Sequence, residues 1–109
     1  MKLHADLSKR VVVDTNEGDW IADEIEGVFH MPLHTDGDEQ VRLTKMDPGC
    51  TVPSHEHADA QEILVLEGTL EDEDGVYPKG TWLRLPAGSR HAPKSAEGCL
   101  LLAKQGHLK

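Results

Sequence analysis

Hydrophobic residues along the chain come in short runs that are separated by clusters of Gly, Pro, Asp and Asn. Residues 39–46 alternate between apolar and polar side chains, with Val41 and Leu43 on one face of a predicted strand. Residues 63–66 are apolar at both parities, which is typical of a strand with two buried faces. Turn signals recur about every 8–12 residues, and no stretch has a helical period. The pattern therefore predicts an all-β sandwich or barrel.

Strand boundaries follow from β-branched runs and turn residues. Residues 1–25 are predicted to form an N-terminal arm with a first strand over residues 10–14. Residues 26–109 are predicted to form the barrel, as one domain, with strands at 26–34, 39–46, 63–66, 69–72, 81–85 and 99–104. Gly68 is expected to end the strand before it, and Asp74-Gly75 is expected to make a hairpin turn.

Two histidines lie one residue apart, shortly before the apolar run of residues 63–66. On a strand, His55 and His57 would project from the same face, because side chains two apart share a face. Imidazole is the commonest protein ligand for metals and suits zinc, iron, copper and nickel. Surface His-x-His pairs also occur by chance. The evidence that this pair is a metal site comes from a second stretch, residues 80–91.

Together these stretches resemble the two sequence motifs of the cupin family. The first motif, Gly-x5-His-x-His-x3–4-Glu-x6-Gly, is matched at its glycines and histidines by Gly49, His55, His57 and Gly68. The second motif, Gly-x5-Pro-x-Gly-x2-His-x3-Asn, is matched by Gly80, Pro86, Gly88 and His91. Ser95 stands at the position of the motif's Asn.

The sequence around the motifs is similar to that of the cupin domain of ChrR-type anti-sigma factors, over roughly residues 26–106. This resemblance implies a cupin jelly-roll β-barrel (a double-stranded β-helix) that holds one divalent metal ion through three histidines and a carboxylate. ChrR-type regulators also carry an N-terminal zinc-binding helical domain that grips the sigma factor. The present sequence shows no Cys/His cluster ahead of the barrel, so we expect metal binding to carry over and sigma-factor binding not to.

The fourth metal ligand falls on one of two neighbouring residues. Counting back from Gly68 places the motif's Glu on Gln61, whereas counting four intervening residues from His57 places it on Glu62. Strand parity favours Gln61, which shares a face with Ile63. The predicted ligands are therefore His55, His57, Gln61 and His91, with Glu62 as the alternative. A neutral amide would leave the metal charge uncompensated by protein, so the ion would polarise a bound anion or water more strongly.

Charge and composition limit the classes of partner that the protein can bind. The 109-residue chain has a net charge of -9, which argues against nucleic acid and anionic membrane surfaces as partners. The apolar run at residues 99–103 is too short to span a bilayer, and the first residues lack an apolar signal core. We therefore expect a cytoplasmic protein in which Cys50 and Cys99 are reduced and buried.

Two arginines lie close to the second motif. Arg90 is a candidate for holding a substrate carboxylate through two parallel hydrogen bonds. Arg84 is expected to pair with an acidic residue instead. His30 and His34 share strand parity and are expected at the barrel rim or surface.

Two classes of function remain open. One is a metal-dependent dioxygenase that acts on a small organic substrate, with catalytic residues beyond the metal ligands unassigned. The other is a non-catalytic, metal-stabilised sensor or regulatory barrel of the ChrR cupin type. Three histidines and an oxygen donor suit Zn, Fe, Mn, Ni or Cu, so the ligand set does not select one metal. We also expect a homodimer, because the apolar faces of residues 63–66 need cover.

Overall fold

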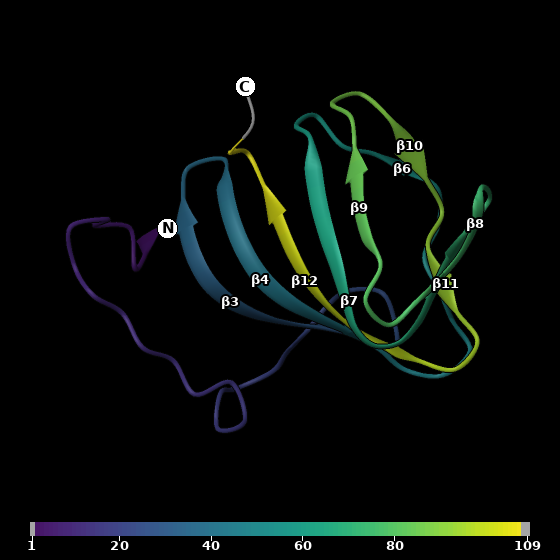
Figure 1. Cartoon of the computed structure of the whole chain (residues 1–109), viewed down its shortest axis with the longest axis horizontal. Coiled ribbons are helices and arrows are strands. Elements are labelled where there is room, and N and C mark those ends of the chain that lie inside the picture. Colours follow the sequence, from purple (N-terminus) through teal and green to yellow (C-terminus); the bar gives the residue numbers. More distant parts are fainter. Residues whose placement is uncertain (1, 108–109) are drawn as a thin grey trace.

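The computed structural model describes residues 2–107, and all of its regular elements are β-strands (Figure 1). The strands are β1 (Lys2–Leu3), β2 (Ile21–Ala22), β3 (Val28–Asp36), β4 (Glu39–Met46), β5 (Cys50–Thr51), β6 (His55–Glu56), β7 (Gln61–Asp72), β8 (Gly75–Pro78), β9 (Trp82–Leu85), β10 (Arg90–His91), β11 (Lys94–Ser95) and β12 (Cys99–Gln105). Within the described residues there is no helix long and apolar enough to cross a membrane.

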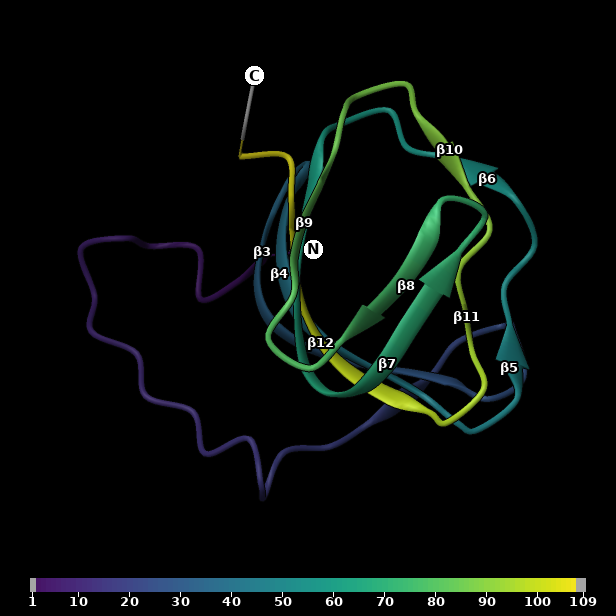
Figure 2. The same ribbon diagram turned by 45° about the vertical axis from the view of Figure 1, so that its right-hand side comes forward.

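The strands curl into a barrel of antiparallel sheet. Ten of them form one sheet whose main path is β1-β3-β4-β12-β7-β11-β5, with β2 beside β3, and β8 and β9 beside β7. β6 and β10 pair separately. Figure 2 shows β3, β4 and β12 on one side of the barrel, facing β5, β6, β10 and β11 on the other. The all-β fold class predicted from the sequence is confirmed.

The longest strand, β7, passes through Gly68, so the prediction that Gly68 ends a strand is wrong. Gly68 has a φ of 72°, and a Cβ there would overlap the carbonyl oxygen of Gly98. The pairing of β7 with β12 shifts register beside this point, between Leu100 and Leu101. Before Gly68, β7 pairs with β9 and β12, and after it β7 pairs with β8 and β11. Glycine thus lets one strand bend between two walls of the barrel.

The hairpin between β7 and β8 turns one residue earlier than predicted. Gly75 is the first residue of β8 and pairs with Asp72, so the loop consists of Glu73 and Asp74. The Asp72 carboxylate fixes the turn, because its Oδ1 accepts hydrogen bonds from the backbone N–H groups of Asp74 (2.8 Å) and Gly75 (3.1 Å).

The strand predicted at residues 10–14 is absent from the structure, and that prediction is wrong. Val11 and Val12 are 45% and 78% exposed, because the arm swings away from the barrel at this point (Figure 1). A β-branched run forms a strand only where a neighbour supplies partners for its N–H and C=O groups. The arm instead pairs at β1 and β2, both with β3. Its later part covers the outside of the sheet, where Lys45 lies 4.6 Å from the Trp20 ring.

The interior of the barrel is apolar on most sides, and its buried core includes Val28, Met46, Ile63, Val65, Leu70 and Leu101. β4 contributes its more polar face to this interior: Arg42, Thr44 and Met46 line the central cavity. Leu43, on the opposite face, is buried outside the cavity.

Candidate metal centre

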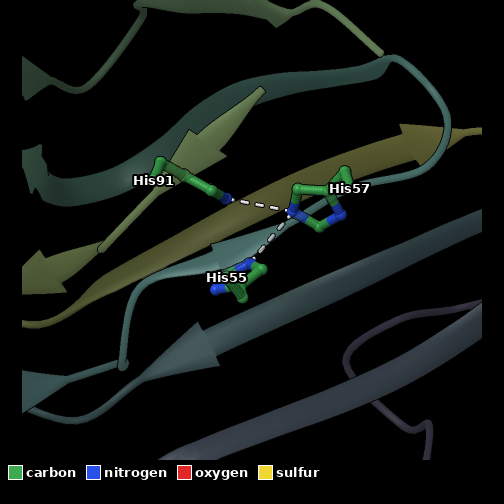
Figure 3. A group of neighbouring side chains, drawn as sticks. All are labelled: His55, His57 and His91. Carbon is green, nitrogen blue, oxygen red and sulfur yellow. Dashed lines mark hydrogen bonds between the residues drawn. The ribbon is translucent and has the colours of Figure 1, made fainter. Parts of the chain in front are cut away.

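Three histidine side chains from the two motifs converge inside the barrel (Figure 3). Nε2 of His57 lies 3.0 Å from Nε2 of His55 and 3.0 Å from Nε2 of His91. His91 is 6% exposed, and the other two rings are half-buried. These three residues form a group that can hold a metal ion.

Backbone pairing between the two motifs brings the rings together. His55 and His91 lie directly opposite each other in the β6–β10 ladder, so their side chains project from the same face. His57 follows β6, and its N–H donates to the carbonyl oxygen of Ser89 (3.2 Å). Its carbonyl oxygen accepts from the N–H of Gly88 (2.8 Å), in the turn after Pro86. The turn of the second motif thus fixes a histidine of the first.

The contacts among the three rings suit a shared cation better than a hydrogen-bond network. An imidazole nitrogen carries either one proton or one lone pair, so Nε2 of His57 cannot satisfy both neighbours equally. Nδ1 of His55 donates to the carbonyl oxygen of Pro53 (3.0 Å), which leaves the lone pair of a neutral ring on Nε2. Metal-bound histidines in proteins are oriented in this way.

The spacing of the nitrogens is compatible with direct metal ligation. Two nitrogens that lie about 2.1 Å from a common metal are about 3.0 Å apart if they subtend about 90°, and about 3.4 Å apart at the tetrahedral angle. The two 3.0 Å separations at His57 match the smaller angle. The residues present therefore fit a bound divalent ion.

The protonation states also favour metal binding. Burial, followed by the charges of His55, His91 and Arg42, lowers the pKa of His57 to about 4. Burial, followed by the charge of His55, lowers the pKa of His91. Both rings are therefore neutral at pH 7, the form that ligates metals.

The three rings lie on the wall of a cavity of about 370 Å³. Most of its lining is apolar and includes Ile25, Val28, Val52, Leu70 and Leu101. The volume falls in the range of pockets that enclose small organic molecules, about 300–1,000 Å³. A metal held by the three histidines would therefore face a space with room for a small ligand.

The two candidates for the fourth ligand lie on opposite faces of β7. Gln61 is 6% exposed and lines the same cavity as the histidines. Glu62 accepts a 3.1 Å hydrogen bond from Nη2 of Arg84. Residues 57–60 separate β6 from β7, so the tertiary fold and not one continuous strand brings Gln61 to the histidine side. The pairing of Arg84 with an acidic residue is confirmed.

Arg90 lies outside the cavity lining. Its side chain is 61% exposed, and Nη1 lies 3.6 Å from a carboxylate oxygen of Glu56. The arginine that lines the cavity is Arg42, which the sequence analysis missed. No decisive signal for it existed in the sequence, because Arg42 shares strand parity with Met46 but Val41 and Leu43 make the other face of β4 the more apolar one.

His30 forms a polar chain at the cavity wall. Burial lowers the pKa of His30, and the neutral ring accepts from the Thr44 hydroxyl at Nδ1 (3.0 Å) and donates from Nε2 to Asp23 (2.7 Å). The second carboxylate oxygen of Asp23 accepts from the backbone N–H of Ile25 (3.0 Å). Both ring nitrogens of His30 thus have a hydrogen-bond partner. The side chains of Asp23, His30 and Thr44 all line the cavity.

A second group with metal-ligand chemistry lies outside the cavity, formed by His34, Glu39 and His107. Nε2 of His34 lies 3.2 Å from Glu39, and Nδ1 donates to the carbonyl oxygen of His4 (3.1 Å). The bond to His4, followed by Glu39, raises the pKa of His34. These contacts favour the protonated His34 ring. An ion pair between His34 and Glu39 therefore explains why these residues lie together without a metal ion.

Solved structures of cupins share this architecture. An RmlC-like cupin from Shewanella frigidimarina matches 89% of the chain and 90% of its own chain, with a TM-score of 0.76 and 19% identity. A putative acetylacetone dioxygenase from Methylibium petroleiphilum matches 89% of the chain and 76% of its own, with a TM-score of 0.81 and 14% identity. At these identities the likeness establishes the fold, which is the predicted cupin barrel.

The relationship to ChrR is more specific. The structure of Rhodobacter sphaeroides SigE in complex with the anti-sigma ChrR matches 84% of the chain with 26% identity and a TM-score of 0.75. The present chain spans about half of that matched chain, 51% of its length. A comparison with curated proteins gave no match. The family described as the ChrR cupin-like domain matches residues 8–109, nearly the whole chain. The chain therefore belongs to the ChrR cupin-like domain family.

Proposed function

We propose that this chain is a mononuclear metal cupin that adds both atoms of O₂ to a small organic substrate. His55, His57 and His91 would hold one divalent ion, with Gln61 as the fourth ligand. The observation that carries the proposal is the convergence of three Nε2 atoms, two of their separations being 3.0 Å, on the wall of a largely apolar cavity. Because both oxygen atoms enter the product, the reaction needs no external reductant.

The protein residues have distinct tasks in this reaction. A bound redox-active ion such as iron would supply the site at which O₂ and a substrate oxygen are activated together. Pro53 holds the His55 ring through its carbonyl oxygen, and Gly88 holds the His57 backbone. Apolar walls such as Val28 and Leu101 limit the water beside the reacting atoms.

The test begins with metal analysis of protein purified without added metal. We expect about one divalent ion per chain, and O₂ consumption with a small diketone or thiol after iron loading. His57→Ala should lose the metal and lower the melting temperature, since ligand loss couples to folding. His4→Ala is the matched control, because His4 is exposed and lies outside the cavity. Unchanged metal content in His57→Ala would contradict the ligand assignment.

A second candidate function is a metal-stabilised regulatory barrel. The family match over residues 8–109 and the 26% identity to the ChrR–SigE structure favour it. In this role the metal would hold the two motifs together without turnover. Tightly held, inert zinc and no O₂ consumption with any substrate of the panel would favour the regulatory barrel over the oxygenase.

We also propose that the barrel is a homodimer. Leu64 and Leu66 of β7 are only partly buried, and the arm exposes Leu7 (82%), Val12 (78%) and Ile21 (57%). A partner subunit would cover these apolar side chains. Sedimentation at micromolar concentration tests this, and a monomeric mass would contradict it.

A further inference from the structure

Arg42 is a cation on the cavity wall that forms no ion pair with a carboxylate of the described residues. Its half-buried side chain projects from the face of β4 that also carries Thr44 and Met46. Nη1 makes one long hydrogen bond, 3.4 Å, to the amide oxygen of Gln40. Within residues 2–107 no carboxylate forms an ion pair with it, and the two oxygens of the nearby Asp23 are engaged by His30 and Ile25. The guanidinium therefore keeps most of its donors free.

The strand register leaves space between Arg42 and the metal side of the barrel. Arg42 pairs with Ala103 of β12, and Ala103 pairs with Ile63 of β7. Neighbouring strands are about 4.8 Å apart, so the backbones of Arg42 and Ile63 are separated by about 10 Å. Ala103 fills this interval with one methyl group, and Gln61 lies two residues from Ile63 on the same strand face. The guanidinium and the three histidines line the same cavity, so one short ligand in it can contact both.

The charges in the cavity are unbalanced toward positive. Each proposed metal ligand is neutral, so a divalent ion would keep both of its charges, and Arg42 adds a third. Among the described residues that line the cavity, Asp23 is the one acidic side chain. Removing unpaired charges from water is unfavourable, and an anionic ligand offsets that cost.

We propose, on the basis of the proposed metal centre, that Arg42 anchors the carboxylate of the substrate. The substrate class is then a small organic acid with a carboxylate at one end, an oxygen donor for the metal at the other, and a short apolar segment between them. The guanidinium fork matches a carboxylate with two parallel hydrogen bonds. Arg42, and not the exposed Arg90, thus determines specificity.

Linear dicarboxylates provide a direct binding test on the zinc-loaded protein, with calorimetry as the readout. We expect affinity to peak at one chain length in the series malonate, succinate, glutarate, adipate and pimelate. The dicarboxylate of that length should bind about 10- to 100-fold more tightly than the monocarboxylate of equal length, because a charged hydrogen-bonded pair contributes that factor. Arg42→Gln should abolish this gain. Arg84→Gln should keep it, since Arg84 pairs with Glu62 outside the cavity.

A ligand change tests the same contact without altering the protein. Converting the far carboxylate of the preferred dicarboxylate to an amide should remove its extra affinity for the wild-type protein. This test remains available even if Arg42→Gln fails to fold. An unchanged affinity for the amide, or the absence of a preferred length with zinc bound, would overturn the role of Arg42 and leave the metal centre standing. Failure of the wild type to bind zinc would overturn both. A preferred dicarboxylate on the zinc-loaded protein, with no O₂ consumption by the iron-loaded protein, would support Arg42 and count against the oxygenase.

Discussion

The N–H of Gly88 donates a 2.8 Å hydrogen bond to the carbonyl oxygen of His57, which joins the turn of one motif to a metal-ligand candidate of the other. Gly88 has a φ of 79°, in the left-handed region that favours glycine. Its Cβ position is nearly free, with the nearest atom, a carboxylate oxygen of Glu56, 3.9 Å away. Backbone conformation, and not space, is therefore the reason for glycine here.

The first prediction is that Gly88→Ala weakens metal binding as well as stability. Forcing an L-residue into the left-handed region costs about 1–2 kcal/mol, and relaxation of the turn would displace His57. Gly37→Ala is the matched control, because Gly37 has a φ of 60°, open space around its Cβ position, and a place outside the cavity. Thermal unfolding with and without zinc should show similar losses for both variants without metal, and a smaller zinc-induced shift for Gly88→Ala alone. Equal zinc-induced shifts would contradict the coupling.

The second prediction concerns the fourth ligand. Gln61→Glu should bind zinc on the order of tenfold more tightly, because a carboxylate adds a negative charge beside the ion. Glu62→Gln should leave zinc affinity unchanged and remove the ion pair with Arg84, a loss of about 1 kcal/mol at most for a surface pair. Competition against a chromophoric chelator measures both affinities. Loss of zinc from Glu62→Gln with none from Gln61→Ala would place the ligand at Glu62.

The third prediction is that Gly68→Ala is strongly destabilising. The added Cβ would overlap the carbonyl oxygen of Gly98, and the backbone is held by β12 before Gly68 and by β8 after it. We expect a loss in unfolding free energy well above the about 1–2 kcal/mol of the left-handed conformation alone. Gly80→Ala provides the comparison, since Gly80 has a φ of 92° but nothing within 4 Å of its Cβ position. Denaturant unfolding of the two variants should separate the cost of the overlap from the cost of the backbone conformation. Equal losses of unfolding free energy in Gly68→Ala and Gly80→Ala would refute the role of the overlap.

The fourth prediction uses Tyr77, the one tyrosine of the chain. Burial, and then the 2.8 Å hydrogen bond from its hydroxyl to Asp72, raises the pKa of Tyr77 to about 12. The folded state holds the neutral phenol more strongly than the unfolded state, whose tyrosine ionises near pH 10. This contribution to stability is complete below about pH 10 and is lost as the pH rises through about 12.

Ultraviolet absorbance of tyrosinate measures this titration, with circular dichroism to confirm that the protein remains folded at each pH. Asp72→Asn should move the midpoint down, because it removes the carboxylate that accepts the bond and opposes ionisation. A midpoint near 10 in folded wild-type protein would show that the hydrogen bond does not hold in solution.

Local signals in the sequence accounted for much of the barrel. The alternation of residues 39–46 predicted β4 with its observed bounds, and the β-branched and Gly/Pro signals located β9 and β12 to within one residue. The spacing of the motifs selected His55, His57 and His91, which converge in the structure. These predictions succeeded because strand periodicity and turn chemistry depend on neighbouring residues.

Other features depended on contacts that the linear pattern does not contain. Val11 and Val12 have strand propensity, but the arm finds no partner strand there. Gly68 reads as a strand end, yet β7 continues through it because β12 pairs with β7 up to Gly68 and β8 pairs with it afterwards. In both cases pairing between distant segments overrode the local preference.

The sequence by itself determined the all-β class, the family and the identity of the converging histidines, because each is encoded in spacing along a strand or turn. Only the tertiary structure decided which face of β4 lines the cavity. Val41 and Leu43 formed the apolar face in the sequence, yet Arg42 and Thr44 line the interior. The reason is that the N-terminal arm packs on the outside of the sheet and gives apolar residues there a second place of burial, where Gly18 lies against Met31. The more polar face of β4 is thereby free to surround a ligand.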